Sequence, residues 1–84
     1  MIYVIIIRRD AQKQAKKLPE KDRIRVIAAI ASLQSDPFRG KQLHGDLDGA
    51  WVIRVWPYRI VYTIEKKIIT VTVLRIGHRN SVYK

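Results

Sequence analysis

Residues 2–7 form a short run of largely apolar, mostly β-branched side chains with no charged position among them. A run without alternation is typical of a strand that is covered on both faces, so the sequence predicts a central strand here. From Asp10 the pattern changes, and Ala11, Ala15 and Leu18 recur at helical spacing with lysines between them. This spacing predicts a short helix that has Asp10 as its N-cap and a basic outer face.

A second helix is predicted directly after the first. Pro19 suits the first turn of a helix, where its missing N–H leaves no hydrogen bond unmade. Apolar residues then recur with the helical period from Ile24 to Leu33, and Asp36-Pro37 ends the pattern. Because almost no linker separates the two helices, they are expected to form an antiparallel hairpin that lies on a sheet.

The second half of the chain alternates as β-strands do. Residues 39–49 form a polar segment without periodicity, which predicts a loop. Three strands joined by short turns follow, at residues 50–56, 58–65 and 68–76. The order β-α-α-β-β-β predicts a single α+β domain over residues 1–84. It combines an antiparallel meander, an added N-terminal strand and a helix hairpin on one face.

The alternation also predicts which side chains share a face of the sheet, because successive side chains of a strand point to opposite sides. The apolar sets, expected to face the core, are Trp51, Ile53 and Val55 in one strand and Tyr58, Ile60, Tyr62 and Ile64 in the next. Arg54 and Arg59 then share the face that carries no helix. Both sets of the last strand are largely apolar, so its faces stay undecided and Arg75 cannot be placed.

Charge points to a polyanionic partner. The chain has 17 Lys and Arg residues against 7 Asp and Glu residues, a net charge of +10 in 84 residues. Nucleic acid is the leading candidate, although an anionic membrane or an acidic protein would also fit charge alone. The cations expected to contact RNA are Lys13, Lys16, Lys17, Lys21, Arg23, Lys41 and Arg75.

Several other classes of site and location are not expected. The chain has no cysteine, and His44 and His78 are far apart in sequence, so neither a metal nor another cofactor is predicted. The N-terminal apolar run is broken by Arg8 and is too short for a signal peptide or a membrane span. No membrane partner is therefore expected, and the lack of cysteine fits the reducing cytoplasm.

The arginines, together with one tyrosine and one histidine, suit RNA cleavage by transfer of a phosphoryl group to the neighbouring 2′-hydroxyl. In that reaction the substrate carries its own nucleophile, so the protein has to align the reacting atoms and stabilise charge on the phosphoryl oxygens. Arginine binds phosphate bidentately and stays charged, which excludes it as a general base at neutral pH. Tyr83 and His78 are the groups available for proton transfer, and the sequence leaves the choice between them open.

Short motifs in the second half of the chain resemble the RelE/ParE toxin superfamily. They are Leu43-His44-Gly45, Trp51-Val52-Ile53-Arg54-Val55, Pro57-Tyr58-Arg59-Ile60-Val61-Tyr62, Leu74-Arg75-Ile76-Gly77-His78-Arg79 and Val82-Tyr83. The strand order and the basic helix hairpin agree with that superfamily, so the resemblance covers essentially the whole chain. The Tyr-Arg, Gly-His-Arg and Val-Tyr motifs are similar to the RelE branch, whose members cut messenger RNA in the ribosomal decoding site.

The resemblance to the RelE branch implies a role for each matching residue. Arg54 and Arg59 would bind and polarise the scissile phosphate, and Arg79 would stabilise the transition state or assist the leaving group. Tyr83 would orient or activate the 2′-hydroxyl, with His78 as a possible proton carrier. The implied partners are the ribosome, its messenger RNA and a RelB-like antitoxin, and the implied reaction needs no metal.

The chain departs from the better-known members in two places. Those members carry a second basic residue where this chain has Val52, and many continue with a helix beyond the position of Tyr83, whereas this sequence ends at Lys84. Two alternative functions stay open within the superfamily, and Val52 bears on the second of them. One is a ParE-like inhibitor of DNA gyrase without catalysis, and the other is a non-catalytic RNA-binding relative.

Overall fold

The computed structural model of the chain describes residues 2–45 and 49–78. Its elements are β1 (Val4–Ile7), α1 (Arg9–Lys16), α2 (Glu20–Ser32), a 3-10 turn (Pro37–Arg39), β2 (Lys41–Gln42), β3 (Ala50–Val55), β4 (Tyr58–Glu65), a second 3-10 turn (Lys66–Ile68) and β5 (Thr70–His78). The strands form one five-stranded sheet in the order β1-β5-β4-β3-β2. Strands β2 to β5 are antiparallel neighbours, and β1 is parallel to β5. The predicted α+β fold is thereby confirmed.

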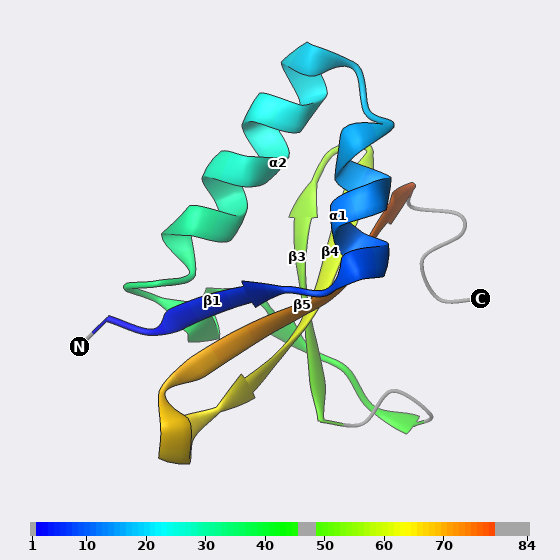
Figure 1. Cartoon of the computed structure of the whole chain (residues 1–84). Helices are drawn as coiled ribbons and strands as arrows, with labels where there is room; N and C mark the ends of the chain where they lie inside the picture. The colour runs from blue at the N-terminus through cyan, green and yellow to red at the C-terminus, as the bar shows by residue number, and fades with distance from the viewer. Residues whose placement is uncertain (1, 46–48, 79–84) are drawn as a thin grey trace.

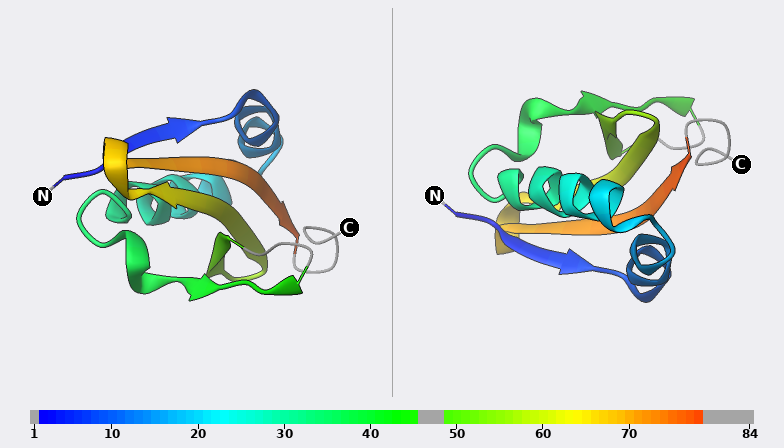
Figure 2. Two further views of the ribbon diagram at one scale, coloured as in Figure 1. Left: turned by 90° about the horizontal axis from the view of Figure 1, so that it is seen from below. Right: turned by 90° about the horizontal axis from the view of Figure 1, so that it is seen from above.

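Both helices pack on the same core layer. α1 contacts β5, and α2 contacts β3 and β4. The chain runs toward the shared connection along α1 and away from it along α2, and the two helices diverge with distance from that connection (Figure 1). Figure 2 shows that α2 crosses one face of the sheet. The buried residues between helices and sheet are Ala11, Ala15, Val26, Ile30, Leu33, Ile53, Ile60, Tyr62, Val71, Val73 and Ile76.

The N-terminal strand is an edge strand, so its predicted central position is wrong. Among the described strands β1 pairs only with β5, and Val4 and Ile6 are 56% and 49% exposed on the side away from α1 and α2. Ile5 and Ile7 pack against the core. A continuous apolar run reads the same from sequence whether its outer side chains face a second layer or an open surface.

The limits of the helices and of the last strand also differ from the prediction. α1 begins at Arg9 with Arg8 as N-cap, so Asp10 lies inside the first turn, where its charge still complements the helix dipole. Pro19 is the N-cap of α2 rather than part of its first turn. β5 starts at Thr70 instead of residue 68, because a 3-10 turn and a left-handed Ile69 precede it, and it extends to His78.

The predicted loop contains a short strand, β2, that the sequence did not reveal. Lys41 pairs with Val52 and Gln42 with Trp51, and the Leu43 N–H donates to the Ala50 carbonyl at 2.8 Å. The sheet therefore ends at β2 rather than at β3. This two-residue addition changes the surroundings of the helix-free face.

Candidate nucleic-acid interface

Two arginines lie directly opposite each other on the face of the sheet that neither α1 nor α2 covers, called the helix-free face below. The register pairs Arg54 of β3 with Arg59 of β4, one step from the Trp56-Pro57 turn. Val55 and Tyr58, their neighbours in the strands, pack on the helix side, so the predicted faces are confirmed. Like charges directly opposite each other in a sheet are destabilising, by an amount within the roughly 0.2–1 kcal/mol of cross-strand pairs. Two like charges kept together at a cost in stability are typical of a site that binds an anionic ligand.

The row of these two arginines continues to β5. Arg59 is paired with Gly77, which has no side chain to cover the guanidinium group. In the described strands β3 to β5 the one acidic residue is Glu65, at the far end of β4 from Arg59. The row Arg54–Arg59–Gly77 is thus a positively charged strip that crosses three strands.

A small apolar cluster lies beside this strip on the same face. Its buried members are Ala50, Val52 and Val61, and Leu43 and Leu74 pack against them. Val52 is only 4% exposed, so its side chain fills space and is not presented to a ligand. The residue that departs from the better-known members is therefore part of a packed contact between the sheet and the β2–β3 segment.

A basic hollow of about 420 Å³ lies at one end of the strip, where β2 begins and β3 extends past it. Its lining consists of Arg39, Gly40, Lys41, Val52, Ile53 and Arg54. Lys41 shares the face of Val52, because the two are register partners. Arg39 is a candidate that sequence reasoning missed, since it lies in an aperiodic segment and reaches the hollow only through the fold.

A second basic hollow, of about 350 Å³, lies at the other end of the strip. It is lined by Asp10, Lys13, Gln14, Lys17, Arg75, Ile76 and Gly77, between α1 and β5. The Gln14 side chain accepts a hydrogen bond of 2.7 Å from the Ile76 N–H, which fixes α1 against the strand. Three of the expected RNA contacts, Lys13, Lys17 and Arg75, are brought together here.

Arg75 could not be placed from sequence because β5 is irregular at this point. The register shifts between Val61 and Tyr62, so Val61 is opposite Arg75 while Tyr62 is opposite Val73. One extra residue, Leu74, lies between these pairs, and a bulge of this kind breaks the alternation of period two.

The remaining helix cations lie elsewhere. Lys16 and Arg23 line a hollow of about 220 Å³ between the two helices, together with Ile7, Gln12, Ala15, Ile27 and Ile76. Lys21 is exposed in the first turn of α2. The structure does not bring these three cations together with Arg54 and Arg59.

His78 is placed on the helix side of the sheet, away from the arginine pair. Its register partner is Tyr58, and the two rings are 6.3 Å apart in an edge arrangement. The Tyr58 hydroxyl donates to Asp22 Oδ2 at 2.7 Å, and this hydrogen bond raises the pKa of the phenol above its usual value. Asp22 is also 3.6 Å from the guanidinium group of Arg25. These contacts connect the start of α2 to the start of β4, next to the β3–β4 turn.

Two predicted residues, Arg79 and Tyr83, lie outside the described residues, so their roles stay predictions. Within residues 2–45 and 49–78 no group of three or more His, Cys, Asp or Glu side chains is arranged to hold a metal ion. In that same part of the chain no helix has the length and apolarity needed to cross a bilayer.

Comparison with known proteins gives a consistent picture. Residues 5–83 match the family model described as ParE toxin of type II toxin-antitoxin system, parDE. The chain is 33% identical to Toxin RelG of Mycobacterium tuberculosis over 86 residues, which covers 100% of this chain and 99% of the relative. It is 31% identical to Toxin RelE of the same organism, over 98% of this chain and 87% of the relative.

Solved structures share the fold. The toxin–antitoxin complex RelBE2 of Mycobacterium tuberculosis contains a chain with a TM-score of 0.86 and 32% identity, covering 94% of this chain and 93% of that chain. A mutant of the Escherichia coli toxin RelE in the free state has a TM-score of 0.82 at 22% identity, over 99% and 90% of the two chains.

Proposed function

Because this chain belongs to the RelE/ParE superfamily of type II toxin–antitoxin toxins, and is RelE-like within it, we propose that it arrests translation by cutting messenger RNA in the ribosomal A site. The observation that supports this most strongly is the Arg54–Arg59 pair on the helix-free face. Two guanidinium groups side by side can hold both non-bridging oxygens of one phosphate. This activity would place the protein in the cytoplasm, where ribosomes work.

The proposed reaction is an attack within the RNA. The 2′-oxygen forms a bond to the adjacent phosphorus while the bond from phosphorus to the 5′-oxygen breaks, which leaves a 2′,3′-cyclic phosphate and a 5′-hydroxyl. One proton leaves the 2′-hydroxyl for a base, and one proton is delivered to the 5′-oxygen. Arg54 and Arg59 would stabilise the charge on the phosphoryl oxygens, so the proposal needs no metal.

The proton carrier is proposed to be Tyr83 or His78. Histidine can both take up and release a proton, but the contact of His78 with Tyr58 places this ring on the helix side. Tyr83 would need neighbouring positive charge to lower its pKa, and Arg79 would help the leaving group. Comparing the pH dependence of cleavage in His78→Gln and Tyr83→Phe variants would distinguish the two acceptors.

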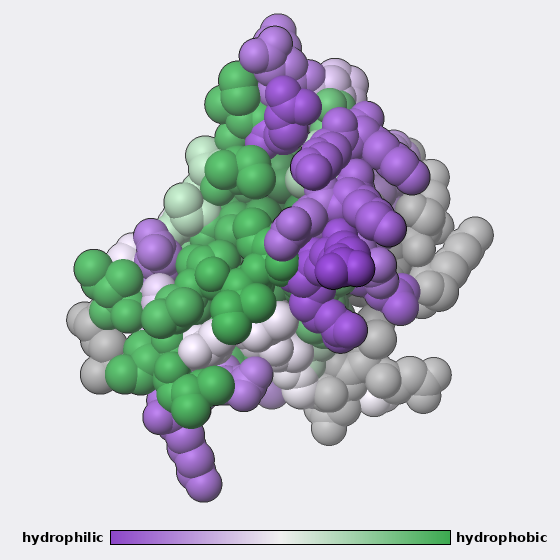
Figure 3. Space-filling model, in the orientation of Figure 1, coloured by the Kyte–Doolittle hydropathy of each residue, from purple (hydrophilic) through white to green (hydrophobic). Residues whose placement is uncertain are grey.

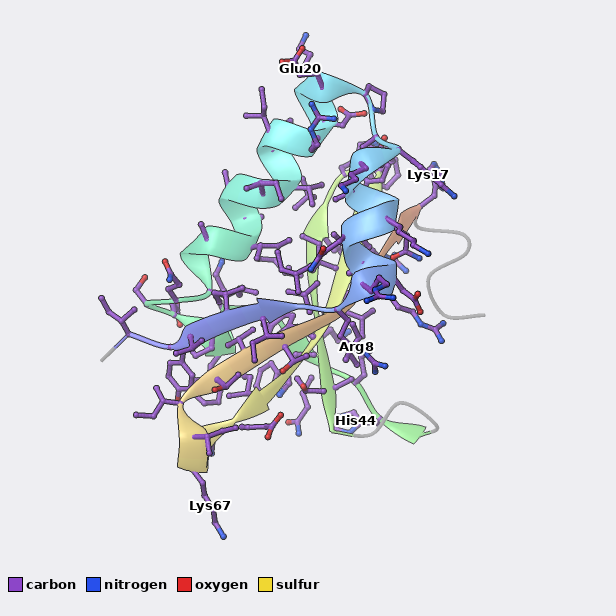
Figure 4. The ribbon with its side chains drawn as sticks, in the orientation of Figure 1. Arg8, Lys17, Glu20, His44 and Lys67 are labelled. Atoms are coloured by element: carbon purple, nitrogen blue, oxygen red, sulfur yellow. The ribbon has the colours of Figure 1, made fainter. Side chains whose placement is uncertain are left out.

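The basic surface over α1 supports binding to ribosomal RNA. Figure 3 shows hydrophilic side chains gathered over α1, and in Figure 4 Lys17 extends from the end of this helix. The cations proposed for this contact are Lys13, Lys16, Lys17, Lys21 and Arg23. A ribosomal contact would hold the toxin while the sheet face meets the messenger.

An apolar surface beside the basic one supports an antitoxin partner. Figure 3 shows hydrophobic side chains spread over β1 and α2, where Val4, Ile6, Ile24 and Ile27 are 45–62% exposed. β1 also has an open edge, to which an extended segment of a partner can add. Solved relatives include toxin–antitoxin complexes named RelBE2 and RelBE. We therefore propose a RelB-like antitoxin with an amphipathic, acidic segment that covers this surface and neutralises the adjacent cations.

The decisive experiment adds the purified chain to ribosomes programmed with a defined messenger and maps cuts by primer extension. Wild type is expected to cut only in the presence of ribosomes, and Arg59→Gln is expected to lose most of this activity. Lys67→Gln is the matched control, because Lys67 projects from the β4–β5 turn away from the strip (Figure 4). Uncut messenger with wild-type protein would refute the proposal.

The two rivals are tested with the same preparations. A gyrase supercoiling assay run in parallel is expected to show no inhibition, and inhibition with intact messenger would favour the ParE-like alternative. Binding to ribosomes without any cut would favour the non-catalytic RNA-binding relative.

A further inference from the structure

The hollow between β2 and β3 gathers three cations from two separate parts of the chain. Arg39 and Lys41 come from the segment after α2, and Arg54 comes from the strip described above. Its volume of about 420 Å³ lies within the roughly 300–1,000 Å³ of ligand pockets. No acidic side chain is part of the described lining, so the hollow is suited to an anion.

The backbone that carries Arg39 and Lys41 is held firmly in place. The buried Tyr62 hydroxyl donates to the Pro37 carbonyl at 2.7 Å and takes a hydrogen bond from the backbone of Gly40. Burial raises the pKa of the Tyr62 phenol, so the hydroxyl keeps the proton that it donates. The Arg39 guanidinium hydrogen-bonds to the Ser32 hydroxyl at the end of α2.

Gly40 allows this segment to approach β3 closely. A Cβ atom at this position would come within 2.6 Å of the Val52 carbonyl oxygen and would also meet the Tyr62 hydroxyl. Any side chain would therefore push Arg39 and Lys41 away from the strand. The glycine keeps both cations at the rim of the hollow.

The backbone of β3 adds to the positive character of the hollow. The Leu43 N–H bonds to the Ala50 carbonyl, so alternate residues of β3 direct their backbone groups toward β2. This alternation turns the N–H of Arg54 outward to the same edge, just past Val52, which is opposite the first residue of β2. An anion in the hollow would meet this N–H as well as three cationic side chains.

We propose that this hollow binds a second phosphate of the RNA strand, next to the phosphate held by Arg54 and Arg59, with Arg39 and Lys41 as its ligands. This inference rests on the proposed function for the identity of the strand. Arg54 borders both sites, so one strand that crosses the strip would place successive phosphates in them. Lys41 and Arg39 are in this sense positioning residues, because they fix where the strand lies relative to the reacting phosphate.

The test measures RNA binding without ribosomes and without cleavage. The probe is a short fluorescein-labelled oligouridylate with 2′-O-methyl groups, which removes the attacking hydroxyl, and its affinity is measured by anisotropy over a series of salt concentrations. For single strands the slope of log K against log salt changes by about 0.7 for each phosphate contact. We expect Arg39→Gln and Lys41→Gln each to reduce the slope by about 0.7, while Lys67→Gln leaves it unchanged.

One further variant and one modified probe keep the result interpretable. Arg39→Lys keeps the charge but loses the hydrogen bond from the guanidinium group to Ser32, so it is expected to keep the slope. A probe in which one linkage is a neutral methylphosphonate should bind wild type more weakly at one position of the linkage, and Lys41→Gln should remove that difference. Equal slopes for Lys41→Gln and Lys67→Gln would overturn the proposal. A reduced slope together with intact messenger on ribosomes would retain this hollow as an RNA site and refute only the cleavage.

Discussion

Replacing Arg54 by Gln is expected to stabilise the fold while it impairs the activity. Arg54 is exposed and directly opposite Arg59. Opposite side chains in a sheet have Cβ atoms about 5 Å apart, and two unit charges at about that separation repel by about 0.8 kcal/mol in a water-like dielectric. Removing one charge should therefore raise the free energy of unfolding by up to about 0.8 kcal/mol, or roughly 3–6 °C in Tm for a domain of this size.

The measurement is urea unfolding of wild type, Arg54→Gln and Arg54→Lys at low salt and at 1 M NaCl. At 1 M the Debye length is about 3 Å, so the gain in Arg54→Gln should disappear. Arg54→Lys keeps the repulsion and should have the stability of wild type at both salt concentrations. In the ribosome assay Arg54→Gln should lose about 10²–10³ in cleavage rate, the range found when a group that stabilises transition-state charge is removed.

A variant that is more stable but less active distinguishes a ligand-binding arginine pair from a structural one. If Arg54→Gln is less stable than wild type at low salt, or if its gain persists at 1 M NaCl, repulsion across the strands is not the dominant effect. The two arginines would then have to be explained by contacts that hold the sheet together.

Three further predictions concern the surroundings of this strip. Gly40→Ala should destabilise the fold by about 1–3 kcal/mol in urea unfolding, because the added methyl group meets the Tyr62 hydroxyl and the β3 backbone; an unchanged midpoint would contradict the close approach. Gln14→Leu should cost about 1–3 kcal/mol and speed the hydrogen exchange of the Ile76 amide, because that N–H loses its acceptor; unchanged exchange would show that another group accepts it. Ile6→Lys, at an exposed position of β1, should abolish co-purification with the antitoxin but leave ribosome-dependent cleavage intact. Loss of both would show that Ile6 is needed for folding or for the active surface instead.

The strip of arginines could be predicted because β3 and β4 are regular where it lies. Within each strand the alternation is unbroken, through Ala50–Val55 in β3 and from Tyr58 to Val61 in β4, so the apolar side of each strand leaves Arg54 and Arg59 together on the other face. Arg75 could not be placed, because the bulge at Leu74 is invisible in an apolar sequence whose two faces look alike. Regular alternation is thus the condition under which sequence alone predicts a face.

The edges of the sheet could not be predicted for a different reason. β1 reads as a buried strand although one side of it is open, and β2 has only two residues, both polar. Which strand lies at an edge depends on pairing between distant segments, about which local patterns carry no information. Arg39 was missed for the same reason, since only the pairing of Lys41 with Val52 brings it to the hollow.

One layer of strands separates the helices from the arginine strip, so neighbouring residues of a strand face opposite sides. This arrangement has a genetic consequence. In β4, Arg59 faces the open side while Ile60, its neighbour, is fully buried on the other. In a selection for cells that survive expression of this chain, inactivating changes should therefore interleave along the strand. Changes at Ile60 would give survivors that contain little folded protein, and changes at Arg59 would give survivors with a normal amount of it. Survival alone cannot distinguish these two classes, but the level of soluble protein in each survivor can.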